Sequence, residues 1–427
     1  MLSRGRAVMR VRRSARIQKM AFFVSAHNKG NYMNRRNTIA LSLLAVAMGM
    51  LGAPSYGQPT SADSKPLAED RPIGHIEAVH EFYDAMPTGV TRAPNGRIFV
   101  NFPRWGDDVP FTVGEIVGDR VVAYPNAQMN RPDSKHPASS LLSVQSVVAD
   151  YRNRLWILDT AAPSFSAPLQ GGAKLVAVDL ASNKVVKTII FKPDVLYSTT
   201  YVNDVRFDFR VGDEGIAYIT DSSANGPGGI IVVDLASGKA WRKLTAHYST
   251  QVDQSFVAVV EGREMRTAGP GGTHPALHIA SDGIALSADG KTLYYSPLSS
   301  RHLYSIPTAL LRDRDIPEAS VEAAVKDLGE KGASDGLESD ASGAVYAGDY
   351  ERNSIRKMST DGTWETIAHD PRILWPDTLS VGNDGYLYFT ANQLNRMALF
   401  NNGSDLRKKP YTLFRIKIDA APVDLKP

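Results

Sequence analysis

Two copies of one short pattern, between Ser281 and Lys357, constrain the fold of this chain more than any other feature of its sequence. Each copy begins with Asp-Gly, at Asp282-Gly283 and at Asp335-Gly336, and continues as a short strand, a two-residue turn and an aromatic-rich second strand. The turns are Asp289-Gly290 and Ser342-Gly343. Such pairs favour type I′ hairpins, because both central residues need a positive φ. Three or four short antiparallel strands repeated in this way are typical of a propeller blade.

Four further segments carry the same pattern, so we predict an all-β fold, a six-bladed β-propeller. A β-sandwich also contains many short strands, but it would not repeat one motif six times. Two insertions interrupt the repeat: Thr245–Ile279, which joins two blades, and Pro307–Val325, which we expect to be partly helical. An unpaired sheet edge is a liability, so we expect Ile76–Phe82 to close the ring by pairing with the last strands. The six blades are predicted to begin near Pro87, Val144, Tyr201, Ser281, Ser334 and Trp375.

The first 57 residues differ from the rest, since they contain ten Lys or Arg and no Asp or Glu. A basic stretch at Met33–Asn37, an apolar run at Thr38–Leu51 and small residues before Gln58 predict a cleaved signal peptide, with Met33 as the true start. The apolar run is short for a membrane span. We therefore predict a leader at 1–57, a linker at 58–74 and a propeller at 75–427. The mature protein would be secreted or periplasmic, without stable membrane insertion.

The net charge of the chain limits the partners that it can bind, and its cysteine content limits the sources of its stability. The chain has a formal net charge of +3, of which the leader contributes +10, so the remaining residues carry −7. A mildly acidic body argues against a nucleic-acid partner, which needs a basic face. The chain has no cysteine, so disulfides do not contribute and the stability of the exported domain must come from its core.

The starts of the innermost strands are the candidate functional site, because these strands line the central channel of a propeller and converge there from every blade. We expect the residues at these positions to contact a small-molecule ligand. The alternative is structural, since a repeated Asp can also cap the same turn in every blade. Crowded carboxylates would raise one another's pKa, which would let one of them act as a general base. The equivalent positions are Thr88, Asn203, Asp204, Asp282, Asp335 and Asp377.

Two other features have simpler interpretations. Trp105 follows the second strand of the first blade, and we expect it on a rim of the propeller. Asn392 and Asn395 follow the second strand of the sixth blade, where Asn commonly serves a turn.

Several phrases resemble the major royal jelly and yellow family, in a form typical of exported bacterial members. The resemblance covers roughly residues 75–420, and it implies a secreted six-bladed propeller whose channel binds small aromatic or amine ligands. The phrases are Leu155–Asp159, Asn203–Val205, Ser281–Ser287, Leu293–Ser300, Ser334–Leu337 and Trp375–Thr378.

The same positions are more distantly similar to those of gluconolactonase-like propellers, which hold a divalent ion on the channel axis. This similarity implies that Asn203, Asp282 and Asp335 are ligands of one divalent cation, calcium or zinc, with Asp335 also as general base. Thr88 stands where that family has an acid, and its neutral hydroxyl removes one charged ligand. A metal-dependent lactonase-type hydrolase is therefore the alternative function. A protein–protein scaffold is a third, if aromatic side chains block the channel.

Overall fold

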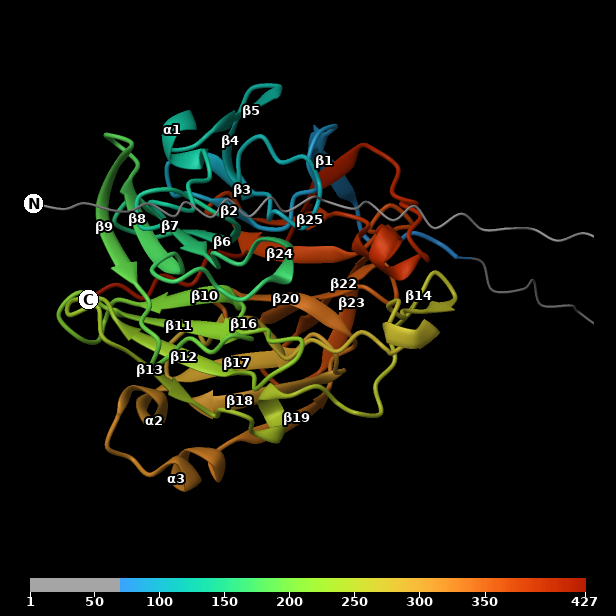
Figure 1. The fold of residues 1–427 in the computed structure, drawn as a ribbon. Helices are drawn as coiled ribbons and strands as arrows, with labels where there is room; N and C mark the ends of the chain where they lie inside the picture. Colours follow the sequence, from blue (N-terminus) through green and yellow to red (C-terminus); the bar gives the residue numbers. More distant parts are fainter. Residues whose placement is uncertain (1–69) are drawn as a thin grey trace, which may run out of the picture. The chain divides into compact units, whose positions relative to one another are not determined.

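Six four-stranded antiparallel sheets form a ring in the computed structural model, which describes residues 70–427 (Figure 1). The innermost strands contact one another in the closed cycle β2, β6, β10, β16, β20, β24 and back to β2. In Figure 1 these strands lie toward the middle of the ribbon, whereas β5, β9, β13 and β19 lie toward its edge. The six-bladed β-propeller predicted from the sequence is confirmed.

The first three blades each run outward from the axis in sequence order. Blade 1 comprises β2 (Val90–Arg92), β3 (Ile98–Asn101), β4 (Val113–Val117) and β5 (Arg120–Ala123). Blade 2 comprises β6 (Val144–Ala149), β7 (Arg154–Asp159), β8 (Lys174–Asp179) and β9 (Lys184–Ile190). Blade 3 comprises β10 (Val202–Asp208), β11 (Ile216–Asp221), β12 (Gly229–Asp234) and β13 (Ala240–Lys243).

The last three blades follow the same order, except that the sixth borrows a strand from the start of the propeller. Blade 4 comprises β16 (Ser281–Leu286), β17 (Thr292–Pro297), β18 (His302–Pro307) and β19 (Lys326–Glu330). Blade 5 comprises β20 (Ser334–Ser339), β21 (Val345–Asp349), β22 (Ser354–Met358) and β23 (Trp364–His369). Blade 6 comprises β24 (Pro376–Val381), β25 (Tyr386–Ala391), β26 (Tyr411–Lys417) and β1 (Ile76–Phe82).

The pairing of β1 with β26 closes the ring. Ile76 lies opposite Ile416 and Phe82 lies opposite Tyr411, in an antiparallel register with one irregularity near Ala78. The expected closing strand is thus confirmed. The chain is already attached to the propeller before β1, because Ile73 forms a bridge with His369. The predicted leader and most of the predicted linker lie outside the described residues.

The two predicted insertions differ in structure. The segment expected to be partly helical contains α2 (Thr308–Arg312) and α3 (Glu318–Glu322), which confirms that prediction. The insertion between blades 3 and 4 contains a small hairpin of β14 (Val259–Val260) and β15 (Arg263–Glu264). One more short helix, α1 (Ala127–Asn130), follows β5.

The C-terminal tail returns across the ring after β26. The carbonyl oxygen of Ala421 accepts from Ala341 N of blade 5 at 2.9 Å. Four residues later, the carbonyl oxygen of Leu425 accepts from Phe209 N, next to β10 of blade 3, also at 2.9 Å. The segment Ala421–Leu425 therefore connects two blades that are not neighbours. The buried side chain of Leu425 anchors its far end.

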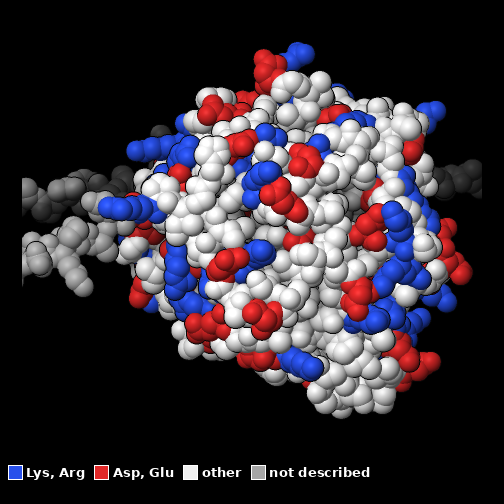
Figure 2. All heavy atoms as spheres, turned by 180° about the vertical axis from the view of Figure 1, so that it is seen from behind, with Lys and Arg blue, Asp and Glu red and all other residues white. Residues whose placement is uncertain are grey.

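The distribution of surface charge and the length of the helices both bear on which partners the protein can contact. Figure 2 shows acidic and basic side chains interspersed over the face opposite that of Figure 1, without a large patch of either sign. Within residues 70–427, no helix combines the length and the apolar character that a membrane crossing requires.

The closing strand yields a first prediction. Phe82 is buried and packs edge-on against Phe102 of blade 1, with ring centroids 5.8 Å apart. Replacing it in Phe82→Ala should lower the free energy of unfolding by about 3 kcal/mol, because a large cavity would open at the seam. Denaturant titration measures the change.

The neighbouring Tyr83 provides the control, since 62% of its surface is exposed. Tyr83→Ala should change stability by less than about 0.5 kcal/mol. Equal losses in the two variants would show that the seam does not hold the ring together.

Candidate functional site

The inner strands of blades 3 to 6 share one irregularity at the start of the strand. In each blade two residues between consecutive ladder partners stay out of the regular register. A bulge of this kind turns side chains away from their usual direction. The pairs of residues left out are Asn203-Asp204, Asp282-Gly283, Asp335-Gly336 and Asp377-Thr378. The predicted site positions of these four blades thus share one local geometry.

Two glycines, Gly283 and Gly336, let the inner strands of neighbouring blades approach each other closely beside the aspartates. A Cβ atom at Gly283 would lie 2.5 Å from the carbonyl oxygen of Asp335, and one at Gly336 would lie 2.4 Å from that of Asp377. Real Cβ atoms do not come so close to an oxygen, so the second residue of the Asp-Gly pair is needed for packing between blades. This close approach brings the preceding aspartates together.

Four aspartates form what we call the axial acidic cluster: Asp204, Asp282, Asp335 and Asp377. Each is at most 7% exposed. Burial, followed by the charge of Asp335, raises the pKa of Asp282 and of Asp377 well above the ordinary value. Burial raises the pKa of Asp335 to about 6 and also raises that of Asp204. The cluster therefore favours protonation or a positive partner.

Asp335 is held by an unusual aromatic pair. The indole Nε1 of Trp375 donates to Asp335 Oδ2 at 2.7 Å, which opposes the rise in the pKa of Asp335. Trp375 is fully buried at a φ of 57° and stacks on Tyr350 with ring centroids 4.1 Å apart. A non-glycine residue in this backbone region stores strain that the surrounding packing must stabilise.

Asp377 is held by Asn392. The Nδ2 of Asn392 donates to Asp377 Oδ2 at 2.7 Å, while its Oδ1 accepts from Leu394 N at 3.1 Å. Asn392 therefore serves the turn as expected, through its bond with Leu394 N. It also orients a residue of the axial acidic cluster.

Asp282 has one paired and one unpaired oxygen. Its Oδ2 accepts from Ser222 Oγ at 3.0 Å, and Ser222 Oγ accepts in turn from Asn203 Nδ2 at 2.9 Å. Its Oδ1 is buried without a hydrogen-bond partner among residues 70–427. A proton shared with Asp335, a metal ion or a cationic ligand would satisfy that oxygen. The structure thus joins Asn203 to the cluster through Ser222, which the sequence did not single out.

Thr88 is engaged elsewhere. Its Oγ1 accepts from Asn101 Nδ2 at 2.9 Å, and its carbonyl oxygen accepts from Thr390 Oγ1 of blade 6 at 2.7 Å. The first contact lies within blade 1, and the second ties blade 1 to blade 6. A ligand contact for Thr88 stays a prediction, as do the ligand and catalytic roles of the other five positions.

An aromatic wall lies beside the axial acidic cluster. Trp105 Nε1 donates to Tyr201 Oη at 2.7 Å, and Phe165 stacks on Trp105 with centroids 5.0 Å apart. Tyr201 is buried and lies within electrostatic range of Asp282, and its hydroxyl donates to Gln145 Oε1 at 3.0 Å. Phe165 is 48% exposed, so one ring of this wall reaches solvent.

Lys331 is a buried cation near the cluster. It is fully buried, and its Nζ donates to the carbonyl oxygen of Gly332 at 3.0 Å. Burial lowers the pKa of Lys331 to about 7, although the charges of Asp349 and Asp282 oppose this change.

Lys331 yields a prediction on pH. Because its pKa falls from 10.5 to about 7 on folding, the unfolded chain binds more protons between those values. The contribution of Lys331 to stability therefore rises with pH across that window. Lys331→Met should raise the free energy of unfolding at pH 7 by about 1 kcal/mol or more and flatten its rise toward pH 10, as measured by denaturant titration. A variant less stable than the parent at pH 7 would contradict this account.

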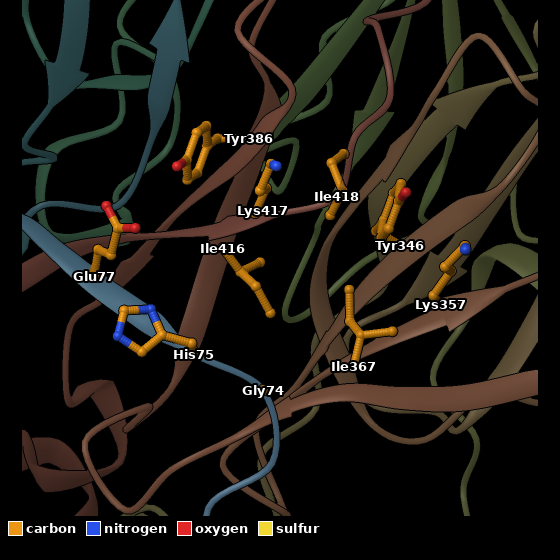
Figure 3. A pocket seen from close by; sticks show the side chains of 10 residues that line it. All are labelled: Gly74, His75, Glu77, Tyr346, Lys357, Ile367, Tyr386, Ile416, Lys417 and Ile418. Carbon is orange, nitrogen blue, oxygen red and sulfur yellow. The ribbon is translucent and has the colours of Figure 1, made fainter.

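Another groove lies away from the axis. It has a volume of about 450 Å³ and lies between blades 5 and 6. Figure 3 shows Glu77 and Tyr386 on one side of it and Tyr346 and Lys357 on the other. None of the predicted site residues lines this groove.

The candidate metal ligands are all oxygen donors. Asn203, Asp282 and Asp335 offer amide and carboxylate oxygens, and Asp282 Oδ1 has no donor among residues 70–427, although the Asp335 carboxyl lies close enough to share a proton with that of Asp282. This donor set suits calcium, whereas zinc prefers nitrogen and sulfur. Among residues 70–427, no three His, Cys, Asp or Glu side chains lie close enough together to hold a metal ion.

Comparison with known proteins places the chain in a family. Residues 142–422 match the family described as Major royal jelly protein. The chain belongs to the major royal jelly protein family. The resemblance seen in the sequence is thereby confirmed, and the match spans most of the propeller.

Individual relatives are more distant. The chain is 26% identical over 248 residues to the protein named yellow of Drosophila erecta, which covers 56% of this chain and 44% of that relative. It therefore matches less than half the length of this relative. Solved structures of similar fold include the calcium-binding protein regucalcin from Agrobacterium tumefaciens, with 14% identity, 82% and 97% coverage of the two chains and a TM-score of 0.47. A gluconolactonase from Xanthomonas campestris has 11% identity, 82% and 95% coverage and a TM-score of 0.48.

Proposed function

We propose that this family member is an exported propeller that binds a small organic cation, an aromatic amine, on its axis. The observation that carries the proposal is the unpaired buried oxygen of Asp282 within four buried carboxyl groups. A buried acceptor without a donor costs free energy, and an ammonium group has three donors to offer. An amine that donates to Asp282 and Asp335 would also reduce the repulsion that raises their pKa values.

The aromatic wall supports the same class of ligand. Aromatic faces attract cations and stack on aromatic ligands. Trp105 and Phe165 present such faces, Trp105 donates to Tyr201 at the start of blade 3, and Phe165 is half exposed. A ligand whose ammonium group contacts the carboxylates and whose aromatic ring packs on this wall would use both features. The leader and the family membership support a secreted or periplasmic location.

Calorimetric titration with tyramine tests the proposal. Tyramine should bind with measurable heat, whereas 4-propylphenol, which keeps the ring and lacks the ammonium group, should bind at least tenfold more weakly. Asp282→Asn should weaken tyramine binding by about tenfold or more, because a hydrogen bond to a charged group is worth about 1.5–3 kcal/mol.

The matched control is Asp119→Asn, which removes a carboxylate that is 96% exposed on the outer hairpin of blade 1. This variant should bind tyramine as the parent does. Equal affinity for tyramine and 4-propylphenol, or equal losses in the two variants, would exclude an amine site at the axial acidic cluster.

The second candidate is the lactonase-type hydrolase, and the same free oxygen of Asp282 favours it. Asn203, Asp282 and Asp335 would hold a calcium ion, which when bound would polarise an ester carbonyl as a Lewis acid. Asp335 would then accept a proton from water as the general base. Trp375 would hold Asp335 in place for that step.

Metal analysis of protein purified without chelator separates the two candidates. The hydrolase requires about one calcium per chain, and Asp335→Asn should lose it because a carboxylate is the stronger ligand. Such a result would justify a lactone screen. Absence of metal from both the parent and Asp335→Asn would exclude the hydrolase and favour amine binding.

A further inference from the structure

Arg206 reaches inside the channel from blade 3 to blade 5. It belongs to β10 of blade 3, and its Nη2 donates to the carbonyl oxygen of Leu337 on β20 of blade 5 at 2.6 Å. The same nitrogen lies 3.5 Å from Glu338 Oε2. Because β16 of blade 4 stands between β10 and β20 in the ring, the guanidinium group reaches past blade 4 inside the channel.

Arg206 also lines a partly open space that we call the far chamber. It has a volume of about 320 Å³ and is lined by residues of the inner strands of all six blades and by Pro422–Leu425 of the C-terminal tail. No residue of the axial acidic cluster lines it. One lining residue from each inner strand is Thr91, Ala149, Arg206, Leu286, Glu338 and Ser380.

Hydrogen-bond donors in the far chamber lack acceptors. Arg206 Nε is buried without a partner among residues 70–427. Thr91 Oγ1 accepts from Ala149 N at 3.0 Å and Ser380 Oγ accepts from Arg92 N at 3.2 Å. Within the described part of the chain neither hydroxyl donates to an acceptor, so both hydrogens remain to be used. Each of these three residues is at most 8% exposed.

Three carboxyl groups line the chamber, those of Asp150, Glu338 and Asp424, and each already has a partner. Glu338 Oε1 accepts from Ser339 N at 2.8 Å, and Oε2 faces Arg206. Burial raises the pKa of Glu338, and the charge of Arg206 opposes that change. The groups left over are therefore donors, which a ligand must meet with an acceptor.

The rest of the lining is mixed, and part of it is apolar. Phe207, Val148 and Val381 line the chamber from the inner strands, and Val423 and Leu425 line it from the tail. A space of this size lies at the lower end of small-molecule pockets. We propose that the far chamber is a second binding site, independent of the axial acidic cluster, for a small carboxylate with an apolar body. Its carboxylate accepts from Arg206, Thr91 and Ser380, and its body packs against these apolar side chains and the tail.

Binding of 4-fluorobenzoate, followed by ¹⁹F NMR, tests this site in the intact chain. The parent should bind the probe saturably, and Arg206→Met should weaken binding by about tenfold or more through loss of a charged donor. Thr91→Val keeps the shape of the side chain and removes one donor, so it should weaken binding several-fold. Asp282→Asn should leave binding unchanged.

Three outcomes overturn the proposal: no saturable binding at millimolar probe, equal binding in Arg206→Met and Thr91→Val to that of the parent, or loss of binding in Asp282→Asn. If Arg206→Met does not fold because Glu338 loses its partner, Thr91→Val and Ser380→Ala carry the test. Tyramine affinity should be the same in Thr91→Val as in the parent. The experiments can therefore exclude one of the two proposed sites without excluding the other.

Discussion

The pairing of β1 with β26 is the constraint on which the other features depend. It gives blade 6 its outer strand and joins the two ends of the propeller in one sheet. A closed ring fixes the distance of all six inner strands from the axis. Only at that distance do Gly283 and Gly336 touch the carbonyl oxygens of the next blade, and only then do the aspartates meet.

This arrangement costs stability, because it buries several carboxyl groups close together. Asp282, Asp335 and Asp377 are buried close together, and their pKa values rise. Arg206 and Lys331 are the nearby cations that offset part of the repulsion. Trp375 adds backbone strain at the same place. Buried like charges and strain are costly for stability, so their concentration at one end of the channel indicates a binding or catalytic site.

The sequence predicted the blades because strand alternation and Asp-Gly turns are local features. It also placed Asp282, Asp335 and Asp377 at equivalent positions, since a repeat carries its geometry from blade to blade. It could not predict contacts made between blades. Ser222 and the bond from Trp375 depend on how closely neighbouring sheets pack, and Arg206 depends on the width of the channel. Asn392 looked like a turn residue because its second contact lies on another strand.

The two ends of the channel have opposite chemistry. The axial acidic cluster offers an acceptor without a donor and an aromatic wall, whereas the far chamber offers donors without acceptors beside apolar side chains and three engaged carboxyl groups. A structure of crystals soaked with 3-bromotyramine tests the central claim most directly, because bromine is located by its anomalous signal. The account predicts bromine near Trp105 and Phe165, with the ammonium group hydrogen-bonded to Asp282. Bromine in the groove between blades 5 and 6, or no ordered ligand, would contradict it.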